Sequence, residues 1–212
     1  MGNNYLRIEN LSKTIKGNNV LKEIHLNVKE HEVLGIQGIN GSGKTMLLRA
    51  VAGLIRCEGK IYFNETEAKN TPLAHDMGVL IEHQGFLNEF TGAENLELLE
   101  ILVKKHSKEE IPGVLREIGL DPKDKRKYGK YSLGMKQRLA IAQAMIYNPK
   151  MILLDEPTNA LDQSGIELLE QMIAKRRNQC TFMISSHDME FLETVSDRIV
   201  KMEGGKLVDR NI

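Results

Sequence analysis

The chain has 212 residues, and its 29 lysines and arginines balance its 29 aspartates and glutamates. This zero net charge argues against a nucleic-acid-binding protein that depends on bulk electrostatic attraction. Apolar residues make up 41% and charged residues 27% of the chain, which excludes a disordered chain and a coiled coil. A chain of this length buries about 70% of its unfolded surface on folding. We therefore expect one compact domain over residues 1–212.

The cysteines and the apolar runs bear on the compartment. Cys57 and Cys180 are the only cysteines, and their spacing is that of neither a zinc site nor a disulfide framework. A reducing compartment suits them. The apolar runs are far shorter than the roughly 18 residues that a membrane span needs, and no targeting segment is visible. The sequence thus predicts a cytoplasmic protein whose membrane role, if any, comes from a partner.

The first third of the chain has the pattern of strands. Apolar and polar residues alternate over residues 5–11 and 24–28, as in half-exposed antiparallel strands. A short apolar strand at 33–38 then enters a glycine-rich turn. An apolar helix is expected to follow over residues 46–54, closed by a glycine near its end.

The hydrophobic pattern of the rest of the chain changes from strand-like to helical and back to strand-like. Beyond a short strand at 79–82, helical spacing runs from about residue 86 to 147, which predicts an inserted helical subdomain. Two continuous apolar runs, 151–154 and 181–185, suit strands covered on both faces of a parallel sheet. Residues 199–208 have the pattern of a terminal hairpin with a Glu-Gly-Gly turn.

A phosphate-binding loop follows the strand at 33–38. Residues 38–45 fit the pattern G-x-x-x-x-G-K-[ST], whose backbone N–H groups surround a triphosphate. Gly41 and Gly43 allow close approach, and the next helix directs its positive end at the phosphate. Lys44 supplies charge to the β and γ phosphates, and the Thr45 hydroxyl is expected to ligate Mg²⁺. Nucleotide contacts are expected from Gly38, Ile39, Asn40, Gly41, Ser42, Gly43, Lys44 and Thr45. The fold expected is an α/β P-loop core with a mainly parallel sheet, an N-terminal antiparallel β subdomain and the helical insertion.

Two acids end the apolar strand at 151–154. Asp155 is suited to hold Mg²⁺, and Glu156 to orient or deprotonate a water. Alone, this strand end is weak evidence, because it is also compatible with a simple exit into a turn at Pro157. Beside a polyphosphate, adjacent carboxylates require a neutralising cation, which implies magnesium.

The segment 131–138, Tyr-Ser-Leu-Gly-Met-Lys-Gln-Arg, opens a predicted helix that runs to about Tyr147. Ser132 suits the N-cap of that helix. A helix N-terminus also binds anions, so the same serine is a candidate phosphate contact. The residues alone leave both roles open.

Four motifs in register resemble those of the ATP-binding cassette (ABC) ATPases, and the resemblance covers essentially the whole chain. They are the loop at 38–45, the signature segment at 131–138, the run Leu-Leu-Asp-Glu-Pro-Thr-Asn-Ala-Leu-Asp ending at Asp162, and Ser185-Ser-His187. The resemblance implies that Ser132 and Gly134 face the γ-phosphate of ATP held by another protomer. It also implies that residues 159–162 form the D-loop at the dimer seam.

His187 has two competing interpretations, because a histidine that follows a strand is usually structural. Ligands nevertheless collect at the carboxyl ends of parallel strands, and the resemblance implies that His187 senses the γ-phosphate. The expected catalytic residues are therefore Glu156, His187 and Lys44. The other five of the six histidines are expected to be structural.

The chain departs from the family pattern near the base and in the signature. Ile15 stands where an aromatic residue usually stacks on adenine, with Val20 as a second apolar contact, so base stacking is expected to be weaker. Leu133 and Met135 replace a glycine and a glutamine of the usual signature. Ser132 and Gly134 are retained, which keeps the phosphate contact.

A third departure concerns the metal. Counting back from residues 94–96, Glu82 holds the position of a magnesium-binding glutamine, and Gln84 follows two residues later. A carboxylate there still binds Mg²⁺, so the expected metal ligands are Thr45, Asp155 and Glu82, with Gln84 as the alternative by a register shift. The glutamate and the Ser-Leu-Gly-Met-Lys-Gln-Arg signature resemble the branch that serves bacitracin and lantibiotic export or self-protection.

Two further features have competing interpretations. The basic run 123–130 is expected to be a solvated loop, with lipid headgroups or RNA as the alternative contact. Phe86, Leu87 and Phe90 are expected either in the core or at the surface that receives a membrane subunit in this family.

The resemblance implies a transport ATPase with ATP and Mg²⁺ as its cofactors. Two protomers, most simply a homodimer, close on ATP and power a separate transmembrane permease, which holds them at the inner face of the cell membrane. The alternative is a non-transport ABC ATPase of an assembly or regulatory complex. No nucleic-acid partner is expected.

Overall fold

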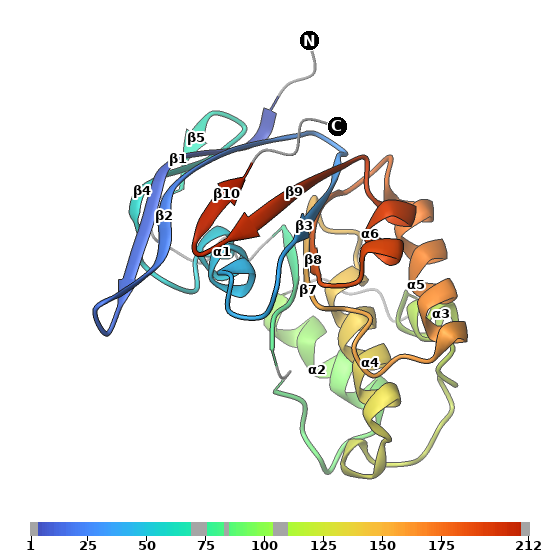
Figure 1. The fold of residues 1–212 in the computed structure, drawn as a ribbon. Coiled ribbons are helices and arrows are strands. Elements are labelled where there is room, and N and C mark those ends of the chain that lie inside the picture. The colour runs from blue at the N-terminus through green and yellow to red at the C-terminus, as the bar shows by residue number, and fades with distance from the viewer. Residues whose placement is uncertain (1–3, 69–75, 83–84, 104–109, 209–212) are drawn as a thin grey trace.

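The computed structural model describes residues 4–68, 76–82, 85–103 and 110–208, which form two sheets and the helices around them (Figure 1). The strands of the antiparallel sheet are β1 (Asn4–Ile15), β2 (Asn18–Lys29), β4 (Glu58–Phe63) and β5 (Thr66–Glu67). Their order is β2-β1-β4-β5. The expected N-terminal antiparallel subdomain is confirmed.

The second sheet is mainly parallel, also as expected. Its strands are β3 (Val33–Gln37), β6 (Met77–Leu80), β7 (Met151–Asp155), β8 (Thr181–Ser186), β9 (Arg198–Glu203) and β10 (Lys206–Val208). They lie in the order β10-β9-β3-β8-β7-β6, and β10 alone pairs antiparallel in this sheet. Since β3, β7 and β8 are buried almost throughout, both faces of the sheet are covered.

Alternate residues of the central strands enter two different cores, because successive side chains of a strand point to opposite faces. On β7, Met151 and Leu153 pack with the antiparallel sheet and with α1 (Lys44–Val51). Ile152 and Leu154 pack on the other face with the remaining helices. The helix α1 therefore lies between the two sheets (Figure 1).

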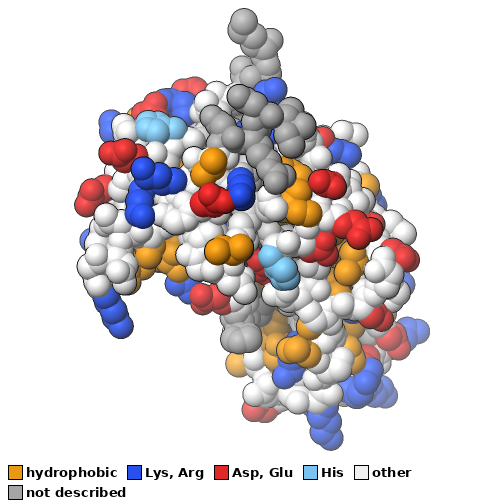
Figure 2. All heavy atoms as spheres, in the orientation of Figure 1, with side chains coloured by type: hydrophobic (Ala, Val, Ile, Leu, Met, Phe, Trp, Pro, Cys, Tyr) orange, Lys and Arg blue, Asp and Glu red, His pale blue; other side chains and the backbone are white. Residues whose placement is uncertain are grey.

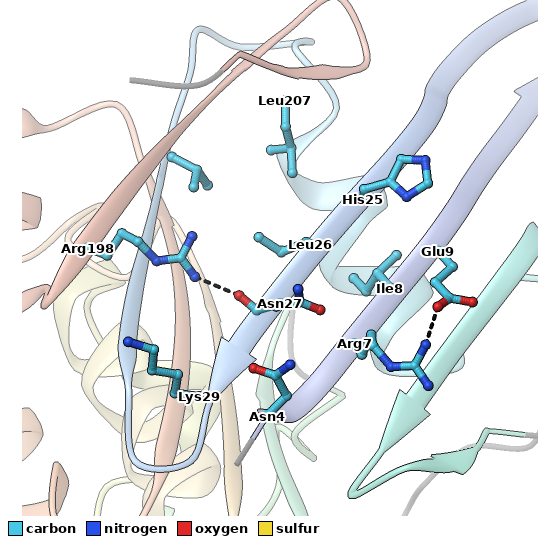
Figure 3. Close-up of a pocket in the computed structure, with 11 residues that line it drawn as sticks. Asn4, Arg7, Ile8, Glu9, His25, Leu26, Asn27, Lys29, Arg198 and Leu207 are labelled. Carbon is cyan, nitrogen blue, oxygen red and sulfur yellow. Dashed lines mark hydrogen bonds and ion pairs between the residues drawn. The ribbon is translucent and has the colours of Figure 1, made fainter. Parts of the chain in front are cut away.

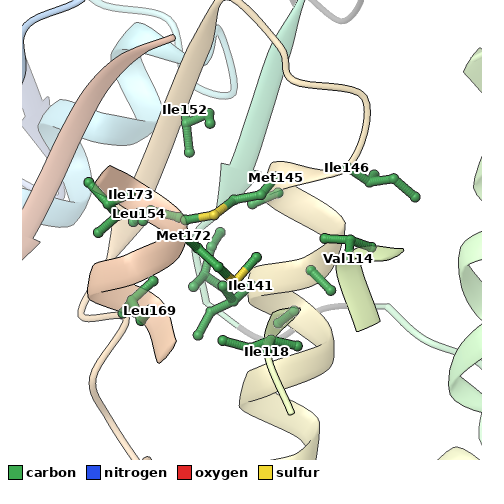
Figure 4. Packing of buried hydrophobic residues seen from close by; sticks show 14 of the residues in the cluster. Val114, Ile118, Ile141, Met145, Ile146, Ile152, Leu154, Leu169, Met172 and Ile173 are labelled. Carbon is green, nitrogen blue, oxygen red and sulfur yellow. The ribbon is translucent and has the colours of Figure 1, made fainter. Parts of the chain in front are cut away.

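The helices of the second core come from two parts of the chain. The first part, between β6 and β7, contains α2 (Gly92–Val103), α3 (Glu110–Glu117), a 3₁₀ turn (Tyr128–Lys130) and α4 (Leu133–Met145). The second part contains α5 (Gln163–Arg176) and α6 (Met189–Val195). Figure 4 shows Val114 and Ile118 from the first part packed near Met172 of α5.

Several element ends differ from the sequence expectation. The signature helix α4 ends at Met145 rather than near Tyr147, because Ile146 is extended (φ −62°, ψ 142°) and Tyr147 has a φ of 69°. The helix expected over 46–54 begins at Lys44 and ends at Val51. The strand expected over 79–82 begins two residues earlier and ends at Leu80.

Among the helices of the described residues, none has the length and apolarity required of a membrane span. Figure 2 shows basic and acidic side chains spread over the visible face.

Candidate functional site

The phosphate loop, residues 38–45, joins the carboxyl end of β3 to the first turn of α1. Gly41 and Gly43 have φ angles of 81° and 111°, a region that glycine enters without the steric cost borne by other residues. A Cβ on Gly43 would lie 2.8 Å from the Val20 carbonyl oxygen. The loop is therefore closely packed behind and exposed in front, where Ile39 is 78% exposed.

Lys44 lies inside the loop, with 5% of its surface exposed. Its Nζ donates hydrogen bonds to the carbonyl oxygens of Gly38 (2.6 Å) and Ile39 (3.3 Å). The same Nζ lies 3.1 Å from Glu156 Oε1. The fold thus brings the cation of the phosphate loop against one of the two acids that end β7.

The other acid, Asp155, faces the hydroxyl of Thr45. Thr45 Oγ1 donates to Asp155 Oδ2 at 2.7 Å, and Ser185 Oγ donates to the second carboxylate oxygen, Oδ1. The β7–β8 register sets Asp155 opposite Ser185. Hydroxyl and carboxylate oxygens are the ligands that a hard divalent cation prefers. In the described part of the chain, no cluster of three or more His, Cys, Asp or Glu side chains suits a metal ion.

Glu156 lies between a cation and a histidine, and its backbone has a φ of 46°. Its Oε2 accepts a hydrogen bond from the His187 backbone N–H (3.2 Å) and lies 2.7 Å from His187 Nδ1. Its Oε1 is buried and, apart from the ion pair with Lys44, has no hydrogen-bond partner among the described residues. Among the described residues, this oxygen is therefore held by Lys44 alone.

A cleft of about 610 Å³ opens in front of these acids. Its lining includes Glu82, Leu133, Lys136, Asp155, Glu156 and Asn159. Glu82 follows β6 in a left-handed conformation (φ 60°) and forms an ion pair with Arg49 of α1. The alternative metal ligand of the sequence analysis, Gln84, lies outside the described residues.

Ser132 is the N-cap of α4, and its Oγ accepts a hydrogen bond from the Met135 N–H at 3.2 Å. A Cβ on Gly134 would lie 2.9 Å from the Ala160 carbonyl oxygen. The signature segment therefore packs against the D-loop of its own chain. The contacts of Ser132 and Gly134 are with these neighbours and not with the phosphate loop.

The two residues expected near the base lie on either side of the turn of the β1–β2 hairpin. Ile15 ends β1 and is 37% exposed, and Val20 lies in β2, where its carbonyl oxygen faces Gly43 and Gly205. The hairpin thus adjoins the phosphate loop, and its residue at position 15 is aliphatic.

Sequence reasoning missed three groups that hold this site together. Gln137 Nε2 donates to the Pro157 carbonyl oxygen at 3.0 Å, which joins α4 to the turn after Glu156. Arg49 pairs with Glu82, and Gly205 contacts the phosphate loop. Gln137 belongs to the signature segment, which was a signal for it. The other two contacts join distant parts of the chain and have no local signal.

The basic run 123–130 forms ion pairs within the chain, as expected of a solvated loop. Arg126 pairs with Asp124 (2.7 Å), and Lys127 pairs with Glu94 (3.2 Å). Hydrogen bonds from the Thr91 backbone and from Lys127 lower the pKa of the Glu94 carboxyl.

The neighbouring aromatic and apolar residues differ in burial. Phe86 is half-buried and packs edge-on against Tyr128, with ring centroids 5.1 Å apart. Leu87 and Phe90 are exposed.

A second hollow of about 550 Å³ lies between β2 and β9 (Figure 3). Arg198 reaches across it and donates to the Asn27 carbonyl oxygen at 2.6 Å, while Arg7 pairs with Glu9 on the opposite side. None of the motif residues lines this hollow, so it is separate from the phosphate loop.

A mainly parallel sheet with a phosphate loop after β3 and a Thr–Asp pair that joins this loop to the end of β7 defines a P-loop nucleotide-binding protein. The ABC transporter family matches residues 21–159. The chain belongs to the family of ABC transporter ATPases, and the resemblance seen in the sequence is confirmed.

Several curated relatives align along nearly the whole chain. The bacitracin transport ATP-binding protein BcrA of Bacillus licheniformis is 37% identical over 96% of this chain and 68% of its own length. The ABC transporter ATP-binding protein YybJ of Bacillus subtilis is 37% identical over 95% of this chain and 94% of its own. The lantibiotic transport ATP-binding protein SrtF of Streptococcus pyogenes is 33% identical over 96% of this chain and 89% of its own length.

Solved structures agree with the fold. A dimeric structure of the ATP-binding cassette MJ0796 in a post-hydrolysis state, bound to ADP and Pi, has a TM-score of 0.88 and 26% identity, covering 96% of this chain and 97% of the other. The chain is therefore an ATP-binding and ATP-hydrolysing transporter subunit, and a second ATPase protomer is its expected partner in the ATP state.

Proposed function

We propose that this chain powers a separate transmembrane permease from its cytoplasmic side, as a single cassette over residues 1–212. The similarity to bacitracin and lantibiotic transport ATP-binding proteins supports this proposal. The exposed side chains of Leu87 and Phe90 beside the helical region are our candidates for the surface that receives the permease. The cargo class we propose is antimicrobial peptides, by analogy with the bacitracin and lantibiotic relatives.

The roles proposed for the phosphate loop follow from its geometry. Backbone N–H groups of residues 38–45 and the N-terminus of α1 bind the triphosphate. Lys44, now held by two loop carbonyls and Glu156, moves its charge to the β and γ phosphates. Ile15 and Val20 contribute apolar contacts to the base.

The proposed magnesium ligands are Thr45 and Asp155, with Glu82 of the neighbouring strand end as a third candidate. The Thr45–Asp155 distance of 2.7 Å supports the first two, because the hydroxyl and carboxylate oxygens are near enough to bind one cation, with the hydroxyl keeping its proton. Bound Mg²⁺ supplies neutralisation of charge on the phosphate oxygens. Thr45 and Asp155 fix where that charge lies.

The observation that carries the catalytic proposal is the position of Glu156. Its carboxylate lies 3.1 Å from Lys44 Nζ and 2.7 Å from His187 Nδ1, and when Lys44 turns to the phosphates its buried Oε1 is left for a water. Glu156 orients and polarises the attacking water, and His187 faces the γ-phosphate. Ser132 and Gly134 reach the γ-phosphate of the second protomer, so hydrolysis requires two copies.

The replacement Glu156→Gln tests this proposal. The amide keeps the shape of the side chain and cannot act as a base, so we expect kcat for ATP hydrolysis to fall by at least about 100-fold, while ATP binding continues. Light scattering should detect an ATP-dependent dimer. The matched control, Glu167→Gln, changes an exposed glutamate of α5 and should leave both properties unchanged. Unimpaired turnover in Glu156→Gln would contradict the proposed base.

Copurification tests the permease. Detergent extracts of cells that express the tagged chain should yield a transmembrane protein with it. Copurification with partners that are not membrane proteins would favour the alternative, an assembly or regulatory ATPase.

A further inference from the structure

Three carboxylates surround one cleft at the ends of two adjacent strands. Leu80 of β6 pairs with Leu154 of β7, so Glu82 lies beside the strand end that carries Asp155 and Glu156. All three acids line the cleft of about 610 Å³. The lining also contains Lys136, so the three acids leave an excess of negative charge that repels an anion bound beside the cleft.

Asp155 and Glu156 contact Thr45 and Lys44 of the phosphate loop. Glu82, in contrast, forms its ion pair with a residue outside the sequence motifs. The partner of Glu82 is Arg49, in the last turn of α1. The Arg49 side chain is 29% exposed and that of Glu82 is 54% exposed. The helix that begins at the phosphate loop therefore also supplies a cation at its other end.

The proposed function places a polyphosphate on the adjoining phosphate loop, where Lys44 contacts Glu156 and Thr45 contacts Asp155, and the inference rests on that function. A triphosphate brings several negative charges toward the three acids. We propose that Arg49 is a positioning residue that acts through Glu82: it holds this carboxylate at the rim of the cleft and neutralises its charge, so that the nucleotide is not repelled. Arg49 itself does not contact the nucleotide.

A double-mutant cycle tests the coupling between the two residues. The dissociation constant of ATP is measured by calorimetry for the full chain, Arg49→Met, Glu82→Gln and the double variant. EDTA is present, which removes any contribution of Glu82 as a metal ligand. We expect Arg49→Met to raise the dissociation constant of ATP about three- to tenfold. The variant leaves the negative charge of Glu82 unbalanced in a partly solvated cleft, which weakens the binding of an anion.

The other two variants show whether Arg49 affects ATP binding through Glu82 or directly. Glu82→Gln should bind ATP at least as tightly as the original chain, and the double variant should return to within about twofold of it. The effect of Arg49→Met should shrink in about 0.5 M NaCl, because salt screens a partly exposed charge. A double variant as weak as Arg49→Met would overturn the proposal, because Arg49 would then act on the nucleotide directly. An unchanged constant in Arg49→Met would overturn it equally.

Two controls separate this inference from the proposed function. Arg177→Met removes an arginine of similar exposure that pairs with Asp197 outside the cleft, and it should leave the ATP constant unchanged. Lys44→Ala tests the phosphate loop itself and should weaken ATP binding at least tenfold. Tight ATP binding by Lys44→Ala would contradict the proposed function, whereas the Arg49 and Glu82 variants decide the inference alone. Melting curves verify that every variant is folded.

Discussion

The backbone N–H of Gly205 donates a hydrogen bond to the Ser42 carbonyl oxygen at 2.9 Å. Gly205 lies in the turn between β9 and β10, near the other end of the chain from the phosphate loop. Its own carbonyl accepts a hydrogen bond from the Lys22 N–H at 2.8 Å. The turn therefore ties β2 to the loop and supports it from behind.

Replacing Gly205 by alanine should damage both stability and ATP binding. The residue has a φ of 83°, and a Cβ would lie 2.8 Å from the Val20 carbonyl oxygen. The left-handed conformation and this contact together should cost about 2 kcal/mol or more. The matched control is Gly204→Ala, where φ is 52° and a Cβ meets nothing within 4 Å. It should cost about 1 kcal/mol and leave ATP affinity unchanged. Urea unfolding and calorimetry measure the two effects, and equal losses of affinity in both variants would contradict the supporting role of Gly205.

The sequence predicted well whatever depends on short patterns. Residues 38–45 carry their loop and its strand-to-helix context within a few positions. The apolar runs of β7 and β8 indicate buried parallel strands, because no polar face is left to cover. The Thr45–Asp155 contact follows once the two motifs are assigned to one site.

Contacts that depend on tertiary packing could not be predicted. Glu82 was expected only as a metal ligand, and its ion pair with Arg49 arises because β6 ends beside the last turn of α1. The end of α4 at Met145 depends on Tyr147 in a left-handed conformation, for which its side chain gives no signal. Both the Glu82–Arg49 ion pair and the end of α4 therefore depend on contacts between residues far apart in the sequence.

Ser132→Ala separates the two roles of this serine. Loss of the N-cap hydrogen bond should cost about 1 kcal/mol of stability. Loss of a phosphate contact should lower kcat/KM for ATP by at least about tenfold. The control is Thr91→Ala, because Thr91 and Glu94 exchange hydrogen bonds as a capping box at the start of α2 (2.6 and 3.2 Å). Thr91→Ala should lose comparable stability and keep its activity. Similar losses of activity in the two variants would contradict the phosphate contact and show that Ser132 acts only as an N-cap.

Arg138 joins the signature helix to two other elements. Its Nη1 donates to the Ile118 carbonyl oxygen (2.9 Å), and its Nη2 lies 2.7 Å from Asp162 Oδ1. The Arg138 hydrogen bond lowers the pKa of the Asp162 carboxyl, with a further contribution from the Gly165 N–H. Arg138→Met should lose about 1–2 kcal/mol through the Ile118 carbonyl and reduce ATPase activity. Asp162→Asn retains the N-cap oxygen of α5 and should reduce activity less. A fully active Arg138→Met would show that this link is dispensable.

Glu117 makes the stability of the chain depend on acidity. Its carboxylate pairs with Lys175 and with Arg176 Nη2 (2.6 Å), and the Arg176 side chain is only 8% exposed. Burial raises the pKa of Glu117, but the hydrogen bonds from the two cations outweigh it and leave the pKa below its ordinary value.

The depressed pKa fixes the direction of the pH dependence. The stability that Glu117 contributes is fully present above the unfolded-state pKa, and it is lost as the pH falls through the lower folded-state value. Glu117→Gln leaves the buried Arg176 without its anion and should cost about 1–3 kcal/mol at neutral pH, a range reduced for the partial exposure of Glu117. Urea unfolding of both proteins should therefore show a difference that is constant above about pH 5 and shrinks at lower pH. Glu67→Gln, which removes an exposed partner of Lys60 at 3.9 Å, should change stability by less than about 0.5 kcal/mol at every pH. A Glu117→Gln difference that persists unchanged at acid pH would show that packing of the side chain, and not its charge, provides the stability.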